Sequence, residues 1–265
     1  MTSSAARVTV PQLEVMKREG RKIVVATAYD FPTAQIADEA GVDVILVGDS
    51  LAVVVQGHET TLPVTVEQML YHTEMVRRAT QRALVVGDLP FGSYQQGPAQ
   101  AIDVSVRFLK ETGCDAVKLE SGPRQMETIE ALVGAGIPVM AHVGLKPQSI
   151  RSLGAYRVQR SHNVVDDAKA AEQAGAFSIV LECVSSEIAR EATSQLAIPT
   201  IGIGAGPHCD GQVLVFHDFV GLTAGRTPKF VKKFADVRSL IRDATAAYCD
   251  EVRRGAYPDA DYSYE

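Results

Sequence analysis

Ile45-Leu-Val-Gly-Asp49-Ser50 is a short, branched apolar run that ends in polar residues, and this arrangement decides the fold. It recurs at Leu84-Val-Val-Gly-Asp88, Ala116-Val-Lys-Leu-Glu120, Val139-Met-Ala-His142 and Ser178-Ile-Val-Leu-Glu182. Runs rich in Val, Ile and Leu are typical of buried parallel strands, because both faces of such strands are covered. The segments between the runs have apolar residues at helical spacing and carry residues typical of helix ends. The chain therefore consists of repeated strand–helix units.

The whole chain offers eight strand candidates, at residues 23–29, 43–49, 84–88, 115–120, 138–143, 177–183, 198–203 and 213–217. The sequence therefore predicts an α/β fold, a (β/α)8 TIM barrel, in which the carboxyl ends of all strands share one rim. A length of 265 residues suits one such barrel, and no Ser/Gly linker or block of charge marks a second domain. We expect a single domain over 1–265, with a lead helix at 10–20 and a C-terminal helix at 231–253.

Several local signals predict where individual helices begin and end. Thr65-Val-Glu-Gln68 fits a capping box before a helix. Gly97-Pro98 opens another helix and Gly113 closes it. The segment Glu182-Cys-Val-Ser185 leads into a third helix, which ends before Ile198-Pro199.

Composition excludes several classes of protein. A net charge of −6 and 22% charged residues give no basic surface suited to nucleic acid. No apolar run resembles a signal peptide or a membrane span. The four cysteines (Cys114, Cys183, Cys209 and Cys249) form no C-x-x-C pair and no zinc-like spacing, which favours free thiols in a reducing cytoplasm.

The strand ends carry the candidate chemistry. Side chains two apart in a strand share a face, so Lys118 and Glu120 both point into the barrel mouth. The same alternation pairs Val47 with Asp49, Val86 with Asp88 and Val180 with Glu182. Asp49, Asp88 and Glu120 should then converge. Two unit charges about 4 Å apart repel by about 4 kcal/mol at an effective dielectric near 20, so three carboxylates need extra protons or a cation.

A cation held by oxygen ligands alone is typical of Mg²⁺ or Mn²⁺ rather than zinc. Lys118 lies beside it, placed to hold a substrate carboxylate or a developing enolate, and a Schiff-base role is the less favoured alternative. Glu182 is the leading candidate for a general base that removes a proton next to a carbonyl. His142 is a candidate hydrogen-bond donor or proton shuttle, or a structural histidine, and the Ser50 hydroxyl is a candidate substrate contact.

Three other segments stand out. Residues 50–65 and 144–163 are longer than barrel connections need to be, which indicates lids over the rim or, alternatively, subunit contacts. Gly202-Ile-Gly-Ala-Gly206 lacks the spacing of a dinucleotide-binding loop. A phosphate cradle is one interpretation, and we favour small residues that permit a close approach of the backbone to a ligand or a loop. The remaining five histidines show no ligand spacing.

From residue 27 to residue 258 the chain resembles the ketopantoate hydroxymethyltransferase (3-methyl-2-oxobutanoate hydroxymethyltransferase) family. The motifs that carry the resemblance occur in order and include Val47-Gly-Asp-Ser50, Val55-Gln-Gly-His58, Thr61-Leu-Pro-Val-Thr65, Asp88-Leu-Pro-Phe91, Val117-Lys-Leu-Glu120, Gly144-Leu-Lys-Pro-Gln-Ser149, Leu181-Glu-Cys183 and Asp210-Gly-Gln212. The resemblance implies a barrel of the phosphoenolpyruvate-mutase and isocitrate-lyase type, one Mg²⁺ per subunit and a cytoplasmic homodecamer.

The reaction that the resemblance implies is transfer of a hydroxymethyl group from 5,10-methylenetetrahydrofolate to 3-methyl-2-oxobutanoate. The product is 2-dehydropantoate, in pantothenate and coenzyme A biosynthesis, formed through a Mg²⁺-stabilised enolate. By motif, Asp49, Asp88 and Glu120 belong to the metal site, directly or through water. Asp49, Ser50, Asp88 and Lys118 lie against the keto acid, and Glu182 accepts the proton, with His142 as a candidate helper. No nucleic acid or membrane partner is implied.

The chain departs from the family pattern mainly in its two long loops. Ala52 stands where many relatives have glycine, and Glu59 where they have aspartate. In the second loop, Ala155 and Arg160 replace two glycines and Arg157 replaces a lysine, which bears on lid motion and folate contacts more than on the metal chemistry.

Two alternatives remain. Another enzyme of the same superfamily, cleaving or rearranging a C–C or P–C bond in a different keto acid, would use similar acids and Mg²⁺. A non-catalytic ligand-binding barrel would explain the glycine-rich segment, but it leaves the four carboxylates without a purpose.

Overall fold

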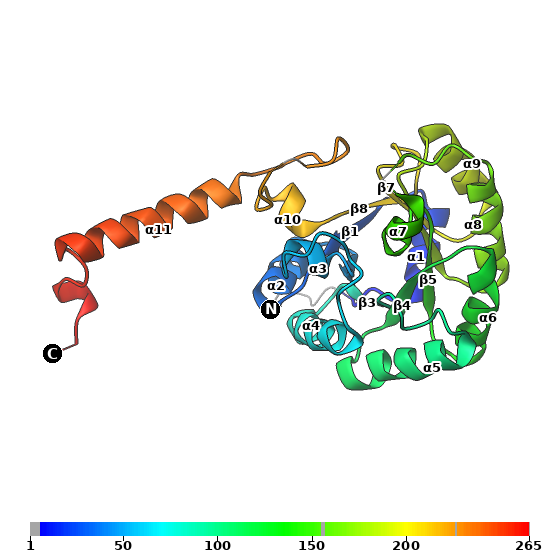
Figure 1. Cartoon of the computed structure of the whole chain (residues 1–265), viewed down its shortest axis with the longest axis horizontal. Helices are drawn as coiled ribbons and strands as arrows, with labels where there is room; N and C mark the ends of the chain where they lie inside the picture. Colours follow the sequence, from blue (N-terminus) through cyan, green and yellow to red (C-terminus); the bar gives the residue numbers. More distant parts are fainter. Residues whose placement is uncertain (1–5, 155–156, 226, 265) are drawn as a thin grey trace. The chain divides into compact units, whose positions relative to one another are not determined.

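Eight parallel strands close into a barrel in the described part of the chain (Figure 1). The first strand, β1, is hydrogen-bonded to both β2 and β8. The predicted (β/α)8 barrel is confirmed. This computed structural model describes residues 6–154, 157–225 and 227–264. The strands are β1 Ile23–Thr27, β2 Val44–Val47, β3 Leu84–Asp88, β4 Ala116–Glu120, β5 Val139–Gly144, β6 Ser178–Glu182, β7 Thr200–Ile203 and β8 Gly211–Leu214.

One helix, α1, precedes the first strand, and the helices that follow the strands pack around the outside of the barrel (Figure 1). They are α1 Val10–Arg18, α2 Phe31–Glu39, α3 Leu51–Val54, α4 Val66–Ala79, α5 Pro98–Arg107, α6 Met126–Gly134, α7 Ile150–Leu153, α8 Asn163–Gln173 and α9 Ser186–Gln195. A π-helical turn, Phe108–Thr112, continues α5, and short 3₁₀ turns lie at Pro123–Gln125 and Pro147–Ser149.

The predicted helix signals are found where they were expected. The Thr65 hydroxyl accepts from the Gln68 N–H at 3.2 Å and the Gln68 side chain accepts from the Thr65 N–H at 2.9 Å, which is the capping box at the start of α4. Pro98 opens α5, and Gly113, in the left-handed region at φ 72°, ends the π turn. Ser185 caps α9 by accepting from the Ile188 N–H.

The barrel interior is filled by side chains that lie two apart along each strand. Ile23 and Val25 of β1, and Val44 and Leu46 of β2, belong to one buried cluster with their counterparts on the other strands. Leu13 and Met16 of α1 join the same cluster, so the lead helix covers one end of the barrel. Because α1 covers this end, a ligand of the barrel interior would approach from the rim at the carboxyl ends of the strands.

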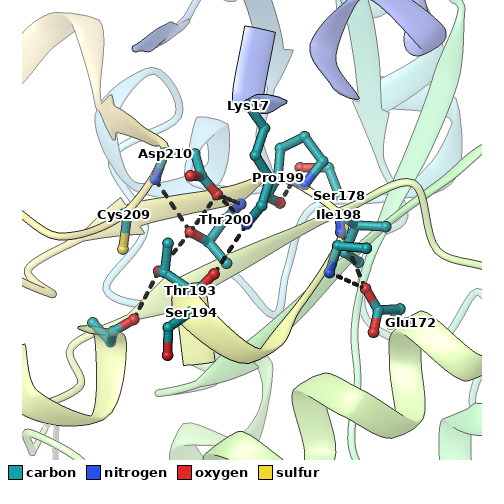
Figure 2. A network of polar contacts seen from close by, with 12 residues as sticks. Lys17, Glu172, Ser178, Thr193, Ser194, Ile198, Pro199, Thr200, Cys209 and Asp210 are labelled. Atoms are coloured by element: carbon teal, nitrogen blue, oxygen red, sulfur yellow. Dashed lines mark hydrogen bonds and ion pairs between the residues drawn. The ribbon is translucent and has the colours of Figure 1, made fainter. Parts of the chain in front are cut away.

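A polar network lies at the opposite, amino-terminal ends of the strands. Lys17 of α1 forms an ion pair with Asp210 at 2.8 Å, and Asp210 accepts from both the N–H and the hydroxyl of Thr200, at 2.9 and 3.0 Å (Figure 2). The Thr200 hydroxyl also meets that of Thr193 at 2.8 Å. Because Thr200 begins β7 and Asp210 immediately precedes β8, these contacts join α1, β7, β8 and α9 and serve stability rather than chemistry.

Strands β1, β2 and β7 are slightly shorter than expected, and two predicted boundaries differ more from the structure. The last strand covers Gly211–Leu214 rather than 213–217, and Phe216 and His217 begin a short helix, α10 Phe216–Phe219. A side chain at position 211 would meet the Ile23 carbonyl oxygen at 2.5 Å, so only glycine lets β8 start this close to β1. A glycine is a weak strand signal, which is why the sequence points to a later start.

The C-terminal helix is the other boundary that differs. It begins at Val237 rather than at residue 231, and α11 covers Val237–Arg254. Upstream, Phe234 N–H donates to the Phe219 carbonyl and Val237 N–H to the Val220 carbonyl, so this stretch is bonded to the end of α10 instead of to itself. The Asp236 carboxylate then caps α11 by accepting from the Ser239 N–H at 3.2 Å.

Two compact units make up the chain, Met1–Val215 with the barrel and Phe216–Glu265 with α10 and α11. The expectation of one domain over 1–265 stays a prediction. Within the second unit, the rings of Phe216 and Phe219 stack edge to face at 5.3 Å, and Gly255 ends α11 in the left-handed region. Among the described residues, no helix combines the length and the apolar composition needed to span a bilayer.

Candidate functional site at the carboxyl ends of the strands

The alternation of each strand brings polar side chains to the rim directly above the apolar interior. Asp88 lies two residues beyond Val86, Lys118 and Glu120 lie two and four residues beyond Ala116, and both Val86 and Ala116 are interior. By the same spacing, His142 follows Met140 and Glu182 follows Val180. The sequence therefore predicted correctly which face of these strands carries the polar residues.

Asp49 reaches the rim by another route. The interior residues of β2 are Val44 and Leu46, and the strand ends at Val47, so the expected alternation of Val47 with Asp49 is wrong. The chain instead turns after Gly48, and the Asp49 N–H donates to Asp88 Oδ2 at 3.0 Å. A side chain on residue 48 would meet the Ser50 Oγ at 2.8 Å, so glycine lets the Ser50 hydroxyl keep its position at this turn.

A buried ion pair forms the centre of the site. Lys118 Nζ donates to both carboxylate oxygens of Asp88, at 2.8 and 2.9 Å, and both side chains are almost completely buried. An ammonium group has three N–H donors, so one remains for a ligand after the two bonds to Asp88. A buried pair of this kind is costly to break, because removing one partner leaves an uncompensated charge in a low dielectric.

Negative charge exceeds positive charge here. Asp49, Asp88 and Glu120 bring three carboxyl groups and Lys118 one ammonium, and all four are buried. Burial, followed by the neighbouring charge of Asp88, raises the pKa of Asp49 from 3.8 to about 7. Burial and then the charge of Asp49 likewise raise the pKa of Glu120 well above its ordinary value. Burial alone would lower the pKa of Lys118, but the three carboxylates outweigh it and raise that pKa.

These groups match a divalent cation in charge and in ligand type. The donors are carboxylate oxygens, which Mg²⁺ prefers, and a charge of +2 would balance three carboxylates against one lysine. Within the ranges that the structure describes, however, no three His, Cys, Asp or Glu side chains are arranged closely enough to hold one ion together. The donor chemistry fits a cation, and a complete set of ligands would include water or substrate oxygens.

Sequence reasoning missed the residue that connects these carboxylates. Gln148, buried in the 3₁₀ turn after β5, donates from its side-chain amide to Asp49 Oδ2 at 2.9 Å and from its backbone N–H to Glu120 Oε1 at 2.8 Å. The buried Tyr94 hydroxyl donates to Gln148 Oε1 at 2.7 Å. Both residues lie in irregular loops, where no periodicity predicts the direction of a side chain.

His142 and Glu182 form a second group beside the first. Their side chains approach to 3.3 Å between Nε2 and Oε2, which is within ion-pair range but too poorly aligned for a hydrogen bond. Among the described residues, neither ring nitrogen of His142 has a hydrogen-bond partner. The Glu182 side chain keeps 17% of its surface exposed, whereas that of His142 keeps 3%. Because His142 pairs in register with Glu120, the two groups lie on neighbouring strands.

Ser50 and the start of the second long loop complete the rim. The Ser50 hydroxyl meets that of Tyr29 at 2.8 Å, a partner that the sequence did not indicate. Gly144 adopts φ 93°, and a Cβ there would meet the Glu182 carbonyl oxygen at 2.4 Å. The motif glycine of Gly144-Leu-Lys-Pro147 therefore lets the loop leave directly beside Glu182.

Beyond that point the second loop returns to β6. Gln159 N–H donates to the Cys183 carbonyl at 2.7 Å, and Ser185 N–H donates to the Gln159 carbonyl at 3.1 Å. Cys183 itself has a left-handed backbone, with φ 48°. Arg157 and Arg160 are exposed, whereas Ala155 lies outside the described residues. The lid function of both long loops stays a prediction.

The glycine-rich segment after β7 permits close packing, as we favoured. A Cβ on Gly202 would meet the Cys209 Sγ at 2.9 Å, and one on Gly206 would meet the Ser186 side chain at 2.5 Å. These neighbours belong to the chain itself, so the glycines bring the β7–β8 connection against the start of α9.

The geometry at the rim agrees with the similarity of the whole chain to known proteins. A model of the ketopantoate hydroxymethyltransferase family matches residues 7–260. The chain belongs to this family. A 3-methyl-2-oxobutanoate hydroxymethyltransferase of Rhodopirellula baltica is 56% identical over 98% of this chain and 97% of its own length. A 3-methyl-2-oxobutanoate hydroxymethyltransferase of Desulforapulum autotrophicum is 54% identical over 98% of this chain and 99% of its own length.

Solved structures agree on the fold of this family member. The crystal structure of 2,3-dimethylmalate lyase, a member of the PEP mutase/isocitrate lyase superfamily, matches with a TM-score of 0.61. The match covers 96% of this chain and 91% of that chain at 19% sequence identity, a level that supports the barrel architecture alone. The predicted family resemblance is confirmed, and the solved structure supports the predicted barrel. The superfamily of that barrel stays a prediction.

Proposed function

We propose that this chain transfers a hydroxymethyl group from 5,10-methylenetetrahydrofolate to 3-methyl-2-oxobutanoate and forms 2-dehydropantoate for pantothenate biosynthesis. The observation that carries the proposal is the match of the family model over residues 7–260, on a chain that keeps Asp49, Asp88, Lys118 and Glu120 together at one rim. In the net reaction one water is consumed and tetrahydrofolate is released, so the water supplies the new hydroxyl group.

Asp49, Asp88 and Glu120 would hold Mg²⁺, directly or through water. The ion would supply positive charge at the ketone oxygen, where negative charge develops. The donor chemistry and the excess of carboxylates at the rim support this assignment. We also propose 5,10-methylenetetrahydrofolate as the co-substrate, a cytoplasmic location and assembly into a homodecamer, as the family resemblance implies.

Binding of the keto acid falls to the chain's own donors. The free third N–H of Lys118 would bind a carboxylate or ketone oxygen, because its other two donors are occupied by Asp88. The Ser50 hydroxyl, kept in place by Tyr29, would offer a second donor.

Removal of the C3 proton is the role we assign to Glu182. Its carboxylate is partly exposed at the rim, so a substrate can reach it, and it stands 3.3 Å from His142. The C3–H bond breaks, its proton passes to a Glu182 oxygen, and its electron pair forms the bond to the methylene carbon of the folate as one carbon–nitrogen bond of that carbon breaks. Water then replaces the second carbon–nitrogen bond and leaves its hydroxyl group on the methylene carbon. The proton from C3 and one proton from the water go to the two nitrogens of the released tetrahydrofolate. His142, whose ring nitrogens have no hydrogen-bond partner in the part of the chain that the structure describes, would take up or return the C3 proton.

Proton exchange tests this proposal directly. The purified protein is incubated with 3-methyl-2-oxobutanoate in D₂O, and the C3 proton is followed by NMR with and without Mg²⁺ and then with the folate. We expect exchange that depends on Mg²⁺, product only with the folate, and loss of both in the variant Glu182→Gln. The matched control Glu187→Gln, the same change at an exposed position of α9, should behave as the wild type.

Two results would contradict the proposal. No exchange and no product from a folded wild-type protein would remove the assigned activity. Exchange without product, together with turnover of a different keto acid, would favour another Mg²⁺-dependent enzyme of the same superfamily.

A further inference from the structure

Gln148 is hydrogen-bonded through every part of its side-chain amide, although it lies in an irregular loop. The amide nitrogen donates to Asp49 Oδ2 at 2.9 Å and to the Leu89 carbonyl at 3.0 Å. The amide oxygen accepts from the Tyr94 hydroxyl at 2.7 Å and from Gln95 Nε2 at 3.3 Å. Only 4% of the residue is exposed, so water competes little for these bonds.

The chemistry of its partners fixes the orientation of this amide. A backbone carbonyl such as that of Leu89 can only accept, so the nitrogen must face it and must also face Asp49 beside it. On the other side, the Gln95 amide is itself oriented, because its oxygen accepts from the Gly92 N–H at 2.7 Å. The Gln95 nitrogen therefore points to Gln148. Because both Gln95 Nε2 and the Tyr94 hydroxyl donate to the same side of the Gln148 amide, the atom on that side must be the amide oxygen.

The position of Gln148 links four strand ends. Asp49 follows β2, Leu89 and Tyr94 follow β3, Glu120 ends β4, and Gln148 follows β5. Its backbone N–H also holds Glu120 Oε1 at 2.8 Å. One residue at the start of the second long loop thus sets the direction of two of the three carboxylates at the rim.

We propose that Gln148 is a positioning residue: its side-chain amide orients the Asp49 carboxylate for holding the divalent cation and the keto acid, and Tyr94 orients that amide. The inference rests on the proposed function. Groups that hold a metal-binding carboxylate in place commonly change metal affinity or activity by about 10–100-fold when they are lost. Gln148 touches no reacting atom in this assignment, so it acts through Asp49.

Calorimetric titration of the full-length protein with Mg²⁺ alone tests the inference. Gln148→Met keeps the length of the side chain and the backbone bond to Glu120 but removes the amide. We expect Mg²⁺ affinity to fall by about 10–100-fold, the KM for the keto acid to rise, and excess Mg²⁺ to restore most of kcat. Gln195→Met, the same change on the surface of α9, should bind Mg²⁺ as the wild type does.

Tyr94→Phe supplies a second, independent variant, because it removes one hydroxyl and keeps the ring. We expect a smaller loss of affinity, and no further loss when it is combined with Gln148→Met, because Tyr94 acts through Gln148. If the losses of Mg²⁺ affinity add in the double variant, Tyr94 does not act through Gln148. If circular dichroism shows that Gln148→Met is not folded, Tyr94→Phe decides: unchanged Mg²⁺ affinity would then overturn the inference.

The outcomes separate this inference from the proposed function. Product formation by the wild type, with unchanged Mg²⁺ affinity in a folded Gln148→Met, overturns the inference alone. Mg²⁺ binding that depends on Gln148 in a protein that makes no product supports the inference and overturns the proposed function. A wild type that binds no Mg²⁺ overturns the inference whatever its activity.

Discussion

Replacing Asp49 by asparagine should make the metal-free protein more stable, and the gain should depend on pH. The pKa of Asp49 is raised from 3.8 to about 7 by burial and by the charge of Asp88. The folded state therefore retains a proton that the unfolded state has already lost between these two pH values. Over that range the wild type loses stability as pH rises, because its native state is forced toward an unfavourable buried charge.

The magnitude follows from the two pKa values. A rise from 3.8 to about 7 is about three pH units, and at 1.36 kcal/mol for each this is about 4 kcal/mol. Below pH 3.8 both states are protonated and the aspartate has no cost. Above pH 7 both are ionised, and the native state carries the full cost. An asparagine side chain has no charge to bury, so Asp49→Asn should gain about 4 kcal/mol at pH 8 and almost nothing near pH 4.

The assay is urea unfolding in EDTA at pH 5, 6, 7 and 8, with stability compared at each pH. Asp103→Asn, the same change at an exposed position of α5, is the matched control and should show no such trend. Mg²⁺ should then stabilise the wild type more than Asp49→Asn, because it binds the native carboxylate. A difference that stays constant with pH, or a variant less stable than the wild type at pH 8, would refute the reasoning.

Three other substitutions have expected outcomes. Lys118→Met leaves the buried carboxylate of Asp88 without its partner, so unfolding in urea should show a loss of about 3–5 kcal/mol. Gly144→Ala places a Cβ against the Glu182 carbonyl oxygen, at a position with left-handed backbone. In steady-state kinetics, kcat should fall by a larger factor than the factor by which the KM for the keto acid changes. Thr65→Ala removes the capping box of α4 and should lower stability by about 1 kcal/mol, measured by thermal unfolding, with kcat unchanged.

Matched controls make these outcomes decisive. Gly134→Ala adds a methyl group in α6 where nothing lies within 4 Å, so it should leave kcat unchanged while Gly144→Ala does not. Lys17→Met breaks the less buried ion pair with Asp210 at the other end of the barrel and should cost less stability than Lys118→Met. A loss of kcat in Lys17→Met would contradict the separation of the stabilising end from the rim.

Much of the site could be predicted because it lies on strands. An apolar run identifies the strand, and a period of two then fixes which residues face the interior, so Asp88, Lys118, Glu120, His142 and Glu182 follow from the pattern. The same reasoning failed for Asp49, because β2 ends at Val47 and a glycine turn carries the chain onward. Alternation holds only while the backbone is extended.

Other residues could not be predicted because their positions depend on contacts between distant segments. Gln148 and Tyr94 lie in loops and meet across 54 positions of sequence. The start of β8 at Gly211 depends on how closely β1 approaches, and the start of α11 at Val237 depends on hydrogen bonds to the end of α10. No local propensity encodes such contacts.

The sequence by itself determined the strand–helix repeat, the barrel and the set of acids at its rim, because these depend on burial and on the period of the backbone. The tertiary structure decided that Asp88 pairs with Lys118, that Gln148 holds Asp49 and Glu120, and how strongly the pKa of Asp49 is raised. Charge interactions in a low dielectric depend on distances between residues far apart in the chain, and only folding sets those distances.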